Sequence, residues 1–164
     1  MDPGRLLLRV TVGGTFVVHG TQKLFGWFGG YGPDGTGQFF ASLGLRPGRR
    51  QAIAAGATEA AGGTLIGLGL ATPLAAAAVT GVMMTALRTA VWKDGFRLGA
   101  GEHEVLLAAA ALALTETGPG RPSLDVARGR ERSGPGWVLA SLGAGAAASA
   151  MTVSMARRGQ ATPA

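Results

Sequence analysis

Residues 60–87 read AAGGTLIGLGLATPLAAAAVTGVMMTAL and contain no Asp, Glu, Lys or Arg over 28 positions. A helix needs about 20 apolar residues to cross the hydrocarbon core of a bilayer, which is about 30 Å thick. The stretch is therefore too long for one span, and Pro73 divides it. We predict two helices, at 51–70 and 73–92, which run antiparallel because only a short turn connects them.

Three more helices are predicted on either side of this pair. Residues 137–156 form a second run without charged residues, 20 positions long, and further apolar segments lie at 5–28 and 101–117. The fold class that we expect is all-α, an integral membrane antiparallel four-helix bundle with an extra C-terminal helix at 137–156. Because Ala and Gly contribute little to membrane insertion, this last helix could instead be buried in protein or lie on the surface. A soluble bundle is disfavoured, since its helices should alternate polar and apolar faces.

The composition excludes several classes of protein. Of the 164 residues, 15% are charged, against about 25% in typical globular proteins, and 47% are hydrophobic. This balance is the reverse of that found in disordered chains. The absence of cysteine excludes disulfides, thiolate metal sites and a cysteine nucleophile on this chain. The net charge of +6 does not predict a nucleic-acid partner, because the basic segment 128–132 has no stacking platform beside it.

The connections between the spans carry weaker signals. The glycine-rich connection at 29–48 contains Phe39, Phe40 and Leu43 at helical spacing, which is typical of a short helix lying in the membrane interface. The connection at 118–136 holds prolines and charges of both signs, and we predict that it is a solvated linker. Lys and Arg occur in connections at both ends of the expected bundle, so the positive-inside rule does not give its orientation.

Polar side chains interrupt the predicted spans at a few positions, and such groups are expensive in lipid. Those of the first helix are spaced by three and four residues and therefore share one face. Because successive helices alternate in direction, the polar positions of four helices fall on the same side of the membrane. We predict one polar chamber there, lined by His19, Gln22, Lys23, Glu59, Arg88, His103 and Glu104.

The charges of this chamber should balance, because a buried charge without a partner is costly. Lys23 and Arg88 would supply two positive charges. Glu59 and one of Glu102 or Glu104 would supply two negative charges. Only Thr, Gly and apolar residues occupy the other half of the second and third spans. The cluster is either a structural ion-pair network or a binding site for a quinone or a similar apolar ligand.

Haem is a third interpretation of the chamber, since His19 and His103 could face each other from the first and fourth helices. An iron held between two histidines needs a wide apolar slot, and Lys23 and Glu104 beside the histidines argue against one. A metal bound by the two histidines and a carboxylate is no better supported. We therefore predict no metal site and disfavour haem.

Four groups of motifs resemble those of a known family. They are HGTQKLFGWFGG at 19–30, EAAGG at 59–63 with GLATP at 69–73, GEHE at 101–104, and GPGRPSLD at 118–125. These motifs are similar to the signatures of the DoxX family of small bacterial integral membrane proteins, and the resemblance covers about residues 5–126. It implies a DoxX-like four-helix transmembrane domain at 1–126. A charged linker at 127–136, the expected fifth membrane helix at 137–156 and a tail at 157–164 lie outside this family core.

The resemblance also implies a location and a class of function. We expect a multi-pass protein of the bacterial inner membrane that is a subunit or accessory of a quinone-linked redox or oxidative-stress complex. Quinone is the implied cofactor, because the chain has no cysteine and no self-sufficient catalytic motif to carry electrons. The expected partners are the lipid bilayer and a soluble oxidoreductase or other membrane subunits, and a homo-oligomer stays open. The alternatives are a non-catalytic membrane anchor for soluble enzymes and a small-molecule transporter.

Overall fold

The computed structural model describes residues 1–93, 95 and 99–158 of the chain. Every regular element within these residues is a helix, which confirms the predicted all-α class. The long helices are α1 (Pro3–Phe25), α3 (Gly48–Leu68), α4 (Thr72–Ala86), α5 (Glu102–Thr117) and α7 (Pro135–Arg158). The short ones are the 3₁₀ turn η1 (Trp27–Gly29), α2 (Gly32–Ser42), the π-helical turn η2 (Leu87–Val91) and α6 (Leu124–Ala127). Of the expected tail at 157–164, the part from 159 onward lies outside the described residues.

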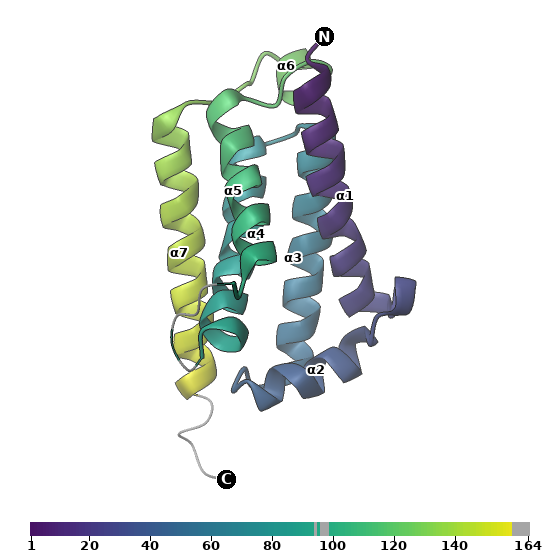
Figure 1. Cartoon of the computed structure of the whole chain (residues 1–164), viewed down its shortest axis with the longest axis vertical. Coiled ribbons are helices and arrows are strands. Elements are labelled where there is room, and N and C mark those ends of the chain that lie inside the picture. Colours follow the sequence, from purple (N-terminus) through teal and green to yellow (C-terminus); the bar gives the residue numbers. More distant parts are fainter. Residues whose placement is uncertain (94, 96–98, 159–164) are drawn as a thin grey trace.

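The long helices lie side by side and alternate in direction along the chain (Figure 1). α1, α3, α4 and α5 form the four-helix bundle, and α7 is the predicted extra helix, which packs on the outside against α4 and, less extensively, α5. We call the end that holds the N-terminus and α6 the N-terminal end, and the opposite end, across which α2 lies, the α2 end (Figure 1). The buried core consists of Val12, Phe16, Ile66, Ala75, Ala76, Val79, Met83, Ala111 and Leu114.

Glycines in a left-handed conformation end two of the long helices. α1 ends at Phe25, earlier than the predicted residue 28, because Gly26 has a φ of +71° and cannot continue the helix. α3 ends in the same way before Gly69, whose φ is +60°. The predicted turn between the two central spans is confirmed, since α4 begins at Thr72 with Pro73 in its first turn, where a missing N–H group costs nothing.

The glycine-rich connection at 29–48 contains a helix, as predicted. This helix, α2, crosses the α2 end of the bundle and contacts α3 and α1 (Figure 1). Phe39 is 56% exposed, whereas Phe40 and Leu43 are half-buried. An exposed aromatic ring on a helix that lies across the end of a bundle is typical of the membrane interface.

Two segments among the described residues are long and apolar enough to cross a membrane by length and composition. They are Thr72–Val91, which comprises α4 and η2, and Pro135–Arg157 of α7. The α7 segment is mostly exposed and presents large apolar side chains such as Leu139 and Met151 outward. A helix that is apolar on its exposed side fits contact with lipid better than contact with water.

Glycines bring the backbones of α1 and α3 into contact at Gly13 and Gly63 and at Gly20 and Gly56. A Cβ atom added to Gly13 would lie 2.5 Å from the carbonyl oxygen of Gly63. One added to Gly20 would lie 2.6 Å from the carbonyl oxygen of Gly56. No side chain fits at such distances, and small residues of this kind let membrane helices approach closely. The α1–α3 pair is therefore the most tightly spaced part of the bundle.

A second glycine contact joins α4 to α7. Gly81 of α4 lies against Gly145 of α7. A Cβ atom added to Gly145 would lie 2.9 Å from the carbonyl oxygen of Ala77. Nearer the N-terminal end, the hydroxyl of Ser141 donates to the carbonyl oxygen of Pro73 at 2.8 Å. α7 is thus docked on α4 by backbone contact and by a hydrogen bond.

The segment 118–136 is not a solvated linker throughout, and for its first half that prediction is wrong. Asp125 is 4% exposed, and its carboxylate accepts hydrogen bonds from the N–H groups of Ala71 and Thr72 at 2.8 and 3.0 Å. The Thr72 hydroxyl donates to the same carboxylate at 2.9 Å. A carboxylate at this position satisfies the free N–H groups that begin α4 and interacts favourably with the helix dipole. Residues 127–133 are exposed, so the prediction holds for this charged stretch.

The N-terminus is tied to the same segment. The backbone N–H of Asp2 donates to the carbonyl oxygen of Arg121 at 3.0 Å, and the N–H of Arg121 donates to the Asp2 carboxylate at 2.9 Å. Arg5 pairs with Asp2 at 2.9 Å and donates to the carbonyl oxygen of Thr117 at 2.6 Å. The Arg121 N–H and the Arg5 guanidinium hold the pKa of the Asp2 carboxyl below its usual range. These bonds connect the start of α1 to the end of α5.

We predict that Gly63→Ala destabilises the fold and that Gly67→Ala does not. A Cβ atom on Gly63 would lie 2.5 Å from the Gly13 carbonyl oxygen and 2.7 Å from Cβ of Phe16, whereas one on Gly67 would have no atom within 4 Å. Overpacking costs roughly 1–3 kcal/mol, and Ala gains up to about 1 kcal/mol over Gly at an open helical position. Thermal unfolding in one detergent compares the two variants. Equal melting temperatures would show that α1 and α3 do not meet at Gly63.

Asp125→Ala should lower the free energy of unfolding by about 1.5–3 kcal/mol, the usual effect of losing hydrogen bonds to a buried charged group. The control is Asp34→Ala, since Asp34 is exposed and pairs with exposed Arg49 at 2.7 Å. Exposed pairs of this kind contribute about 0–1 kcal/mol. Chemical unfolding followed by circular dichroism measures both variants. An equal loss in the two would contradict the role of Asp125 at the start of α4.

Candidate functional site

A buried ion pair lies at the centre of the candidate site. The ammonium nitrogen of Lys23, in the last turn of α1, is 2.6 Å from Oε2 of Glu59, in the middle of α3. Glu59 is 1% exposed, and Lys23 is partly buried. The close approach of the helices makes this contact possible, because a Cβ atom on Gly56 would lie 3.0 Å from Cβ of Lys23. The pairing predicted between Glu59 and a nearby cation is confirmed, with Lys23 as the partner.

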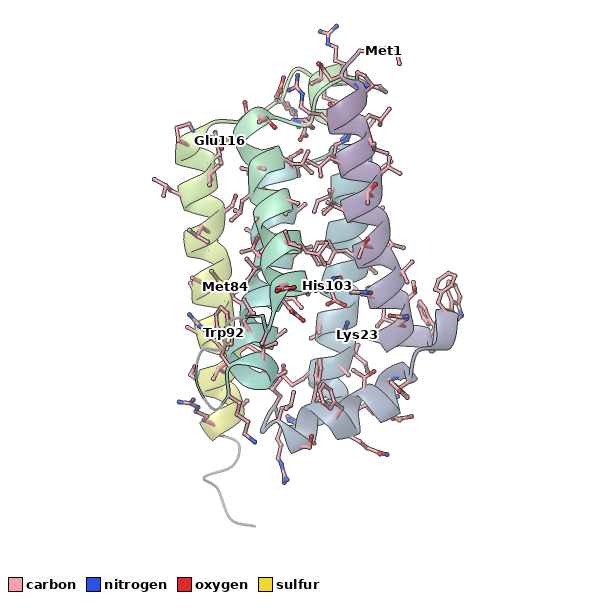
Figure 2. All side chains as sticks on the ribbon, in the orientation of Figure 1. Met1, Lys23, Met84, Trp92, His103 and Glu116 are labelled. Atoms are coloured by element: carbon pink, nitrogen blue, oxygen red, sulfur yellow. The ribbon has the colours of Figure 1, made fainter. Side chains whose placement is uncertain are left out.

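Two histidines lie beside the ion pair. His19 precedes Lys23 by four residues and so shares its face of α1. The imidazole of His103, in the first turn of α5, contacts that of His19, with ring centroids 5.2 Å apart and ring planes at 44°. Figure 2 shows His103 on the side of α5 that faces α1. His19 is half-buried and His103 is exposed. The site can therefore be reached from the side of the bundle where α5 meets α1.

Glu104 lies at the border of this cluster. It is half-buried in the first turn of α5 and directly follows His103 in the chain. Its carboxylate lies near the backbone of Gly101, at 3.8 Å from the position that a Cβ atom would take there. The described structure thus brings together five of the predicted residues: His19, Lys23, Glu59, His103 and Glu104.

The other two predicted residues have different surroundings. The side-chain amide of Gln22 donates to the carbonyl oxygen of Phe28 at 3.2 Å and fixes the turn after α1. Arg88 points to α7, where it donates to the hydroxyl of Ser149 at 3.3 Å. Among the ion pairs of the described residues, none includes Arg88. The predicted charge balance of two against two is wrong in this respect, because α7 provides a polar partner that the four-helix arrangement lacks.

Sequence reasoning missed a second set of buried polar residues at the N-terminal end. Arg9 is 2% exposed and donates to the carbonyl oxygen of Pro122 at 2.6 Å, and its guanidinium packs against Gly69. Asp125 lies in the same layer and caps α4. The expectation of only Thr, Gly and apolar groups concerned the second and third spans, whereas Arg9 comes from α1 and Asp125 from α6, so this end of the molecule is more polar than those two spans alone indicate. The one available signal was Arg9 itself, an arginine inside the apolar run that opens the chain.

The chemistry open to the site follows from its donors and acceptors. The imidazoles can donate or accept a hydrogen bond, and Glu59 offers a carboxylate that Lys23 holds in place. Between residues 1 and 158, leaving aside 94 and 96–98, no three side chains of the His, Asp and Glu types are grouped to hold a metal ion. The arrangement suits a polar ligand group that enters from the side of the bundle and accepts hydrogen bonds.

Comparisons with known proteins give the family context. A model of the DoxX family matches residues 4–92, which include His19, Lys23, Glu59 and Arg88. The chain is 37% identical over 122 residues to a protein of Bacillus subtilis (strain 168) named "Putative oxidoreductase CatD", an alignment that covers 74% of this chain and 84% of the relative. No solved structure matches the chain.

We predict that Lys23→Leu and Glu59→Leu each destabilise the fold by about 3–5 kcal/mol, because each leaves the other charge buried without a partner. The double variant should recover most of this loss, since two apolar side chains replace both charges. The exposed Asp34–Arg49 pair provides a matched control, with a similar separation of 2.7 Å. In that pair, Asp34→Leu, Arg49→Leu and the double variant should change the free energy of unfolding little. A double variant as unstable as the single ones would contradict the pairing of Lys23 with Glu59.

Proposed function

The chain belongs to the DoxX family, and from this premise we propose that it is a multi-pass protein of the bacterial inner membrane that serves a quinone-linked redox complex as a subunit or accessory. The family is membrane-associated, and α7 and the α4–η2 segment are long enough to span a bilayer. The alternating direction of the long helices then makes α1, α3 and α5 the other crossings (Figure 1). The name of the Bacillus subtilis relative supports a link to redox chemistry.

The observation that carries the proposal is the Lys23–Glu59 ion pair next to the His19–His103 contact. Ionisable groups within membrane helices are expensive and by default indicate a functional site. A purely structural pair has no need of two imidazoles beside it, one of them exposed at the side of the bundle. We therefore assign the cluster to a ligand that is dissolved in the bilayer and carries polar atoms.

The residues of the cluster fit a quinone headgroup. A bound quinone supplies the redox step, in which it takes up two electrons and two protons to become a quinol. His19 and His103 can donate hydrogen bonds to its carbonyl oxygens. Glu59 can hold or release a proton next to the ligand, and Lys23 fixes the position of the carboxylate. The electrons come from a partner, a soluble oxidoreductase or another membrane subunit, because the chain has no cysteine of its own.

Haem is disfavoured by the same geometry. An iron with a histidine on each side requires the macrocycle to lie between the two rings. The His19 and His103 rings are in direct contact, with centroids 5.2 Å apart, and Lys23 lies one turn away. The cluster is better suited to a ligand that lies against the exposed edge of the histidine pair.

His19→Ala should weaken the binding of a short-chain ubiquinone roughly fivefold to tenfold, the effect of one lost hydrogen bond. It should change the melting temperature little, because the imidazole is half-buried and its packing is limited. Thr15→Ala is the matched control, since Thr15 lies one turn earlier on α1 and bonds only to its own helix, at the carbonyl oxygen of Thr11. Equilibrium binding to the full chain in mild detergent measures both variants.

The Lys23→Leu/Glu59→Leu double variant separates a ligand site from a structural network. In a quinone site this variant folds but no longer binds the ubiquinone. Unchanged binding in both His19→Ala and the folded double variant would contradict the quinone site. A non-catalytic membrane anchor would then be the better interpretation, and a soluble oxidoreductase that copurifies without quinone would support it.

A further inference from the structure

An apolar cleft lies at the N-terminal end of the molecule, away from the histidine cluster. It has a volume of about 500 Å³ and lies between the first halves of α4 and α7, with the connection after α6 at its mouth. Its walls are almost wholly apolar and come from Leu70, Leu74 and Ala77 on one side and Ala140 and Ala144 on the other. The volume lies within the range of about 300–1,000 Å³ that is typical of small-molecule sites.

Three exposed arginines lie at the mouth of this cleft. Arg128, Arg130 and Arg132 all line it, and the connection that carries them joins α6 to α7. The guanidinium of Arg132 lies over the ring of Trp137, 5.1 Å from its centroid, and Trp137 also lines the cleft. A tryptophan at the start of an apolar helix is typical of the level of the lipid headgroups.

Acidic groups do not neutralise these arginines in the described structure. Asp125 also lines the cleft, but both of its carboxylate oxygens accept hydrogen bonds from the start of α4. The Glu131 carboxylate is turned toward Gly118, at the end of α5. The ion pairs between described residues include none of the three arginines. The mouth of the cleft is therefore a cationic site above an apolar one.

From this arrangement we infer that the cleft binds one anionic phospholipid, with its phosphate at the three arginines and an acyl chain along α4 and α7. Guanidinium groups bind phosphate with paired, charge-assisted hydrogen bonds. The two segments apolar enough to cross a membrane, Thr72–Val91 and Pro135–Arg157, both begin at this cleft. The arginines thus lie where lipid headgroups begin, and the apolar walls lie at the depth of the acyl chains.

The chemistry of the two parts of the cleft distinguishes this ligand from simpler ones. A free phosphate ion would use the arginines but gain nothing from the apolar walls. A lipid with a zwitterionic headgroup would use the walls but gain less from three unpaired cations. Only an anionic amphiphile uses both. The site is separate from the histidine cluster, which lies toward the α2 end (Figure 2), and its test does not depend on quinone binding.

Native mass spectrometry of the full chain in a mild nonionic detergent tests the inference, with phosphatidylglycerol as the probe and phosphatidylcholine as the neutral comparison. We expect one phosphatidylglycerol per chain, bound at least tenfold more tightly than phosphatidylcholine. Replacing Arg128, Arg130 and Arg132 together by Gln should weaken phosphatidylglycerol binding by about tenfold or more. The same triple replacement of Arg46, Arg49 and Arg50, an arginine cluster at the start of α3 at the α2 end, is the control and should have little effect.

A second variant tests the apolar part without changing charge. Ala140→Phe should block the cleft, because Ala140 is an exposed residue of α7 that lines it. Ala147→Phe, on an exposed position of the same helix that does not line the cleft, is the matched control. Equal binding of the two lipids would overturn the inference. The inference would also be overturned if a variant and its control lost phosphatidylglycerol binding equally. Full competition of inorganic phosphate with the lipid would overturn it too, since this would indicate a free-anion site.

Discussion

The backbone contact between α1 and α3 is the constraint on which the candidate site depends. At Gly13–Gly63 and at Gly20–Gly56 the two helices approach until no side chain fits between them. Helices held at this spacing bring the ammonium group of Lys23 to the carboxylate of Glu59, whose position in the middle of α3 is otherwise closed off from water and lipid. These glycines contribute to the site because they have no side chain. A wider spacing between α1 and α3 would separate Lys23 from Glu59 and leave the buried carboxylate without a partner.

Because burying a charge is costly, each buried charged group of the two polar clusters, one around Glu59 and one around Asp125, has a partner. Lys23 and Glu59 balance one another, and Arg88 donates a hydrogen bond to the hydroxyl of Ser149 in α7. At the opposite end, Arg9 donates to a backbone carbonyl group and Asp125 accepts from backbone N–H groups. Backbone dipoles at helix ends can stabilise a single buried charge without a charged partner. The buried charged groups therefore occur either as a pair within the bundle or singly against backbone groups, as for Arg9 and Asp125.

The fold could be predicted from sequence because its signals are local. The charge-free run at 60–87 and its Pro73 set the two central helices to within a few residues. Alternating helix direction placed Glu59 on the same side of the membrane as Lys23 and Arg88, and the structure shows that Lys23 is its partner. Arg88 was misplaced because its partner, Ser149, lies 61 residues away on a helix outside the four-helix pattern. Asp125 was assigned to a solvated linker because it lies among prolines and charges of both signs, and only tertiary contact shows that it caps α4.

α7 connects these features, although it lies outside the residues 4–92 that match the family model. Its contact with α4 at Gly81 and Gly145 places Ser149 next to the end of the α4–η2 segment. The Ser149 hydroxyl there accepts hydrogen bonds from Thr85 and from Arg88, which has no ion-pair partner among the described residues. The same contact places Ala140 and Ala144 opposite Leu74, which creates the apolar cleft below the arginines of the preceding connection. The packing of α7 on α4 therefore has two consequences. Toward the α2 end it gives Arg88 a hydrogen-bond partner, so that Lys23 and Glu59 are left as a balanced pair, and at the N-terminal end it forms the apolar cleft with arginines at its mouth.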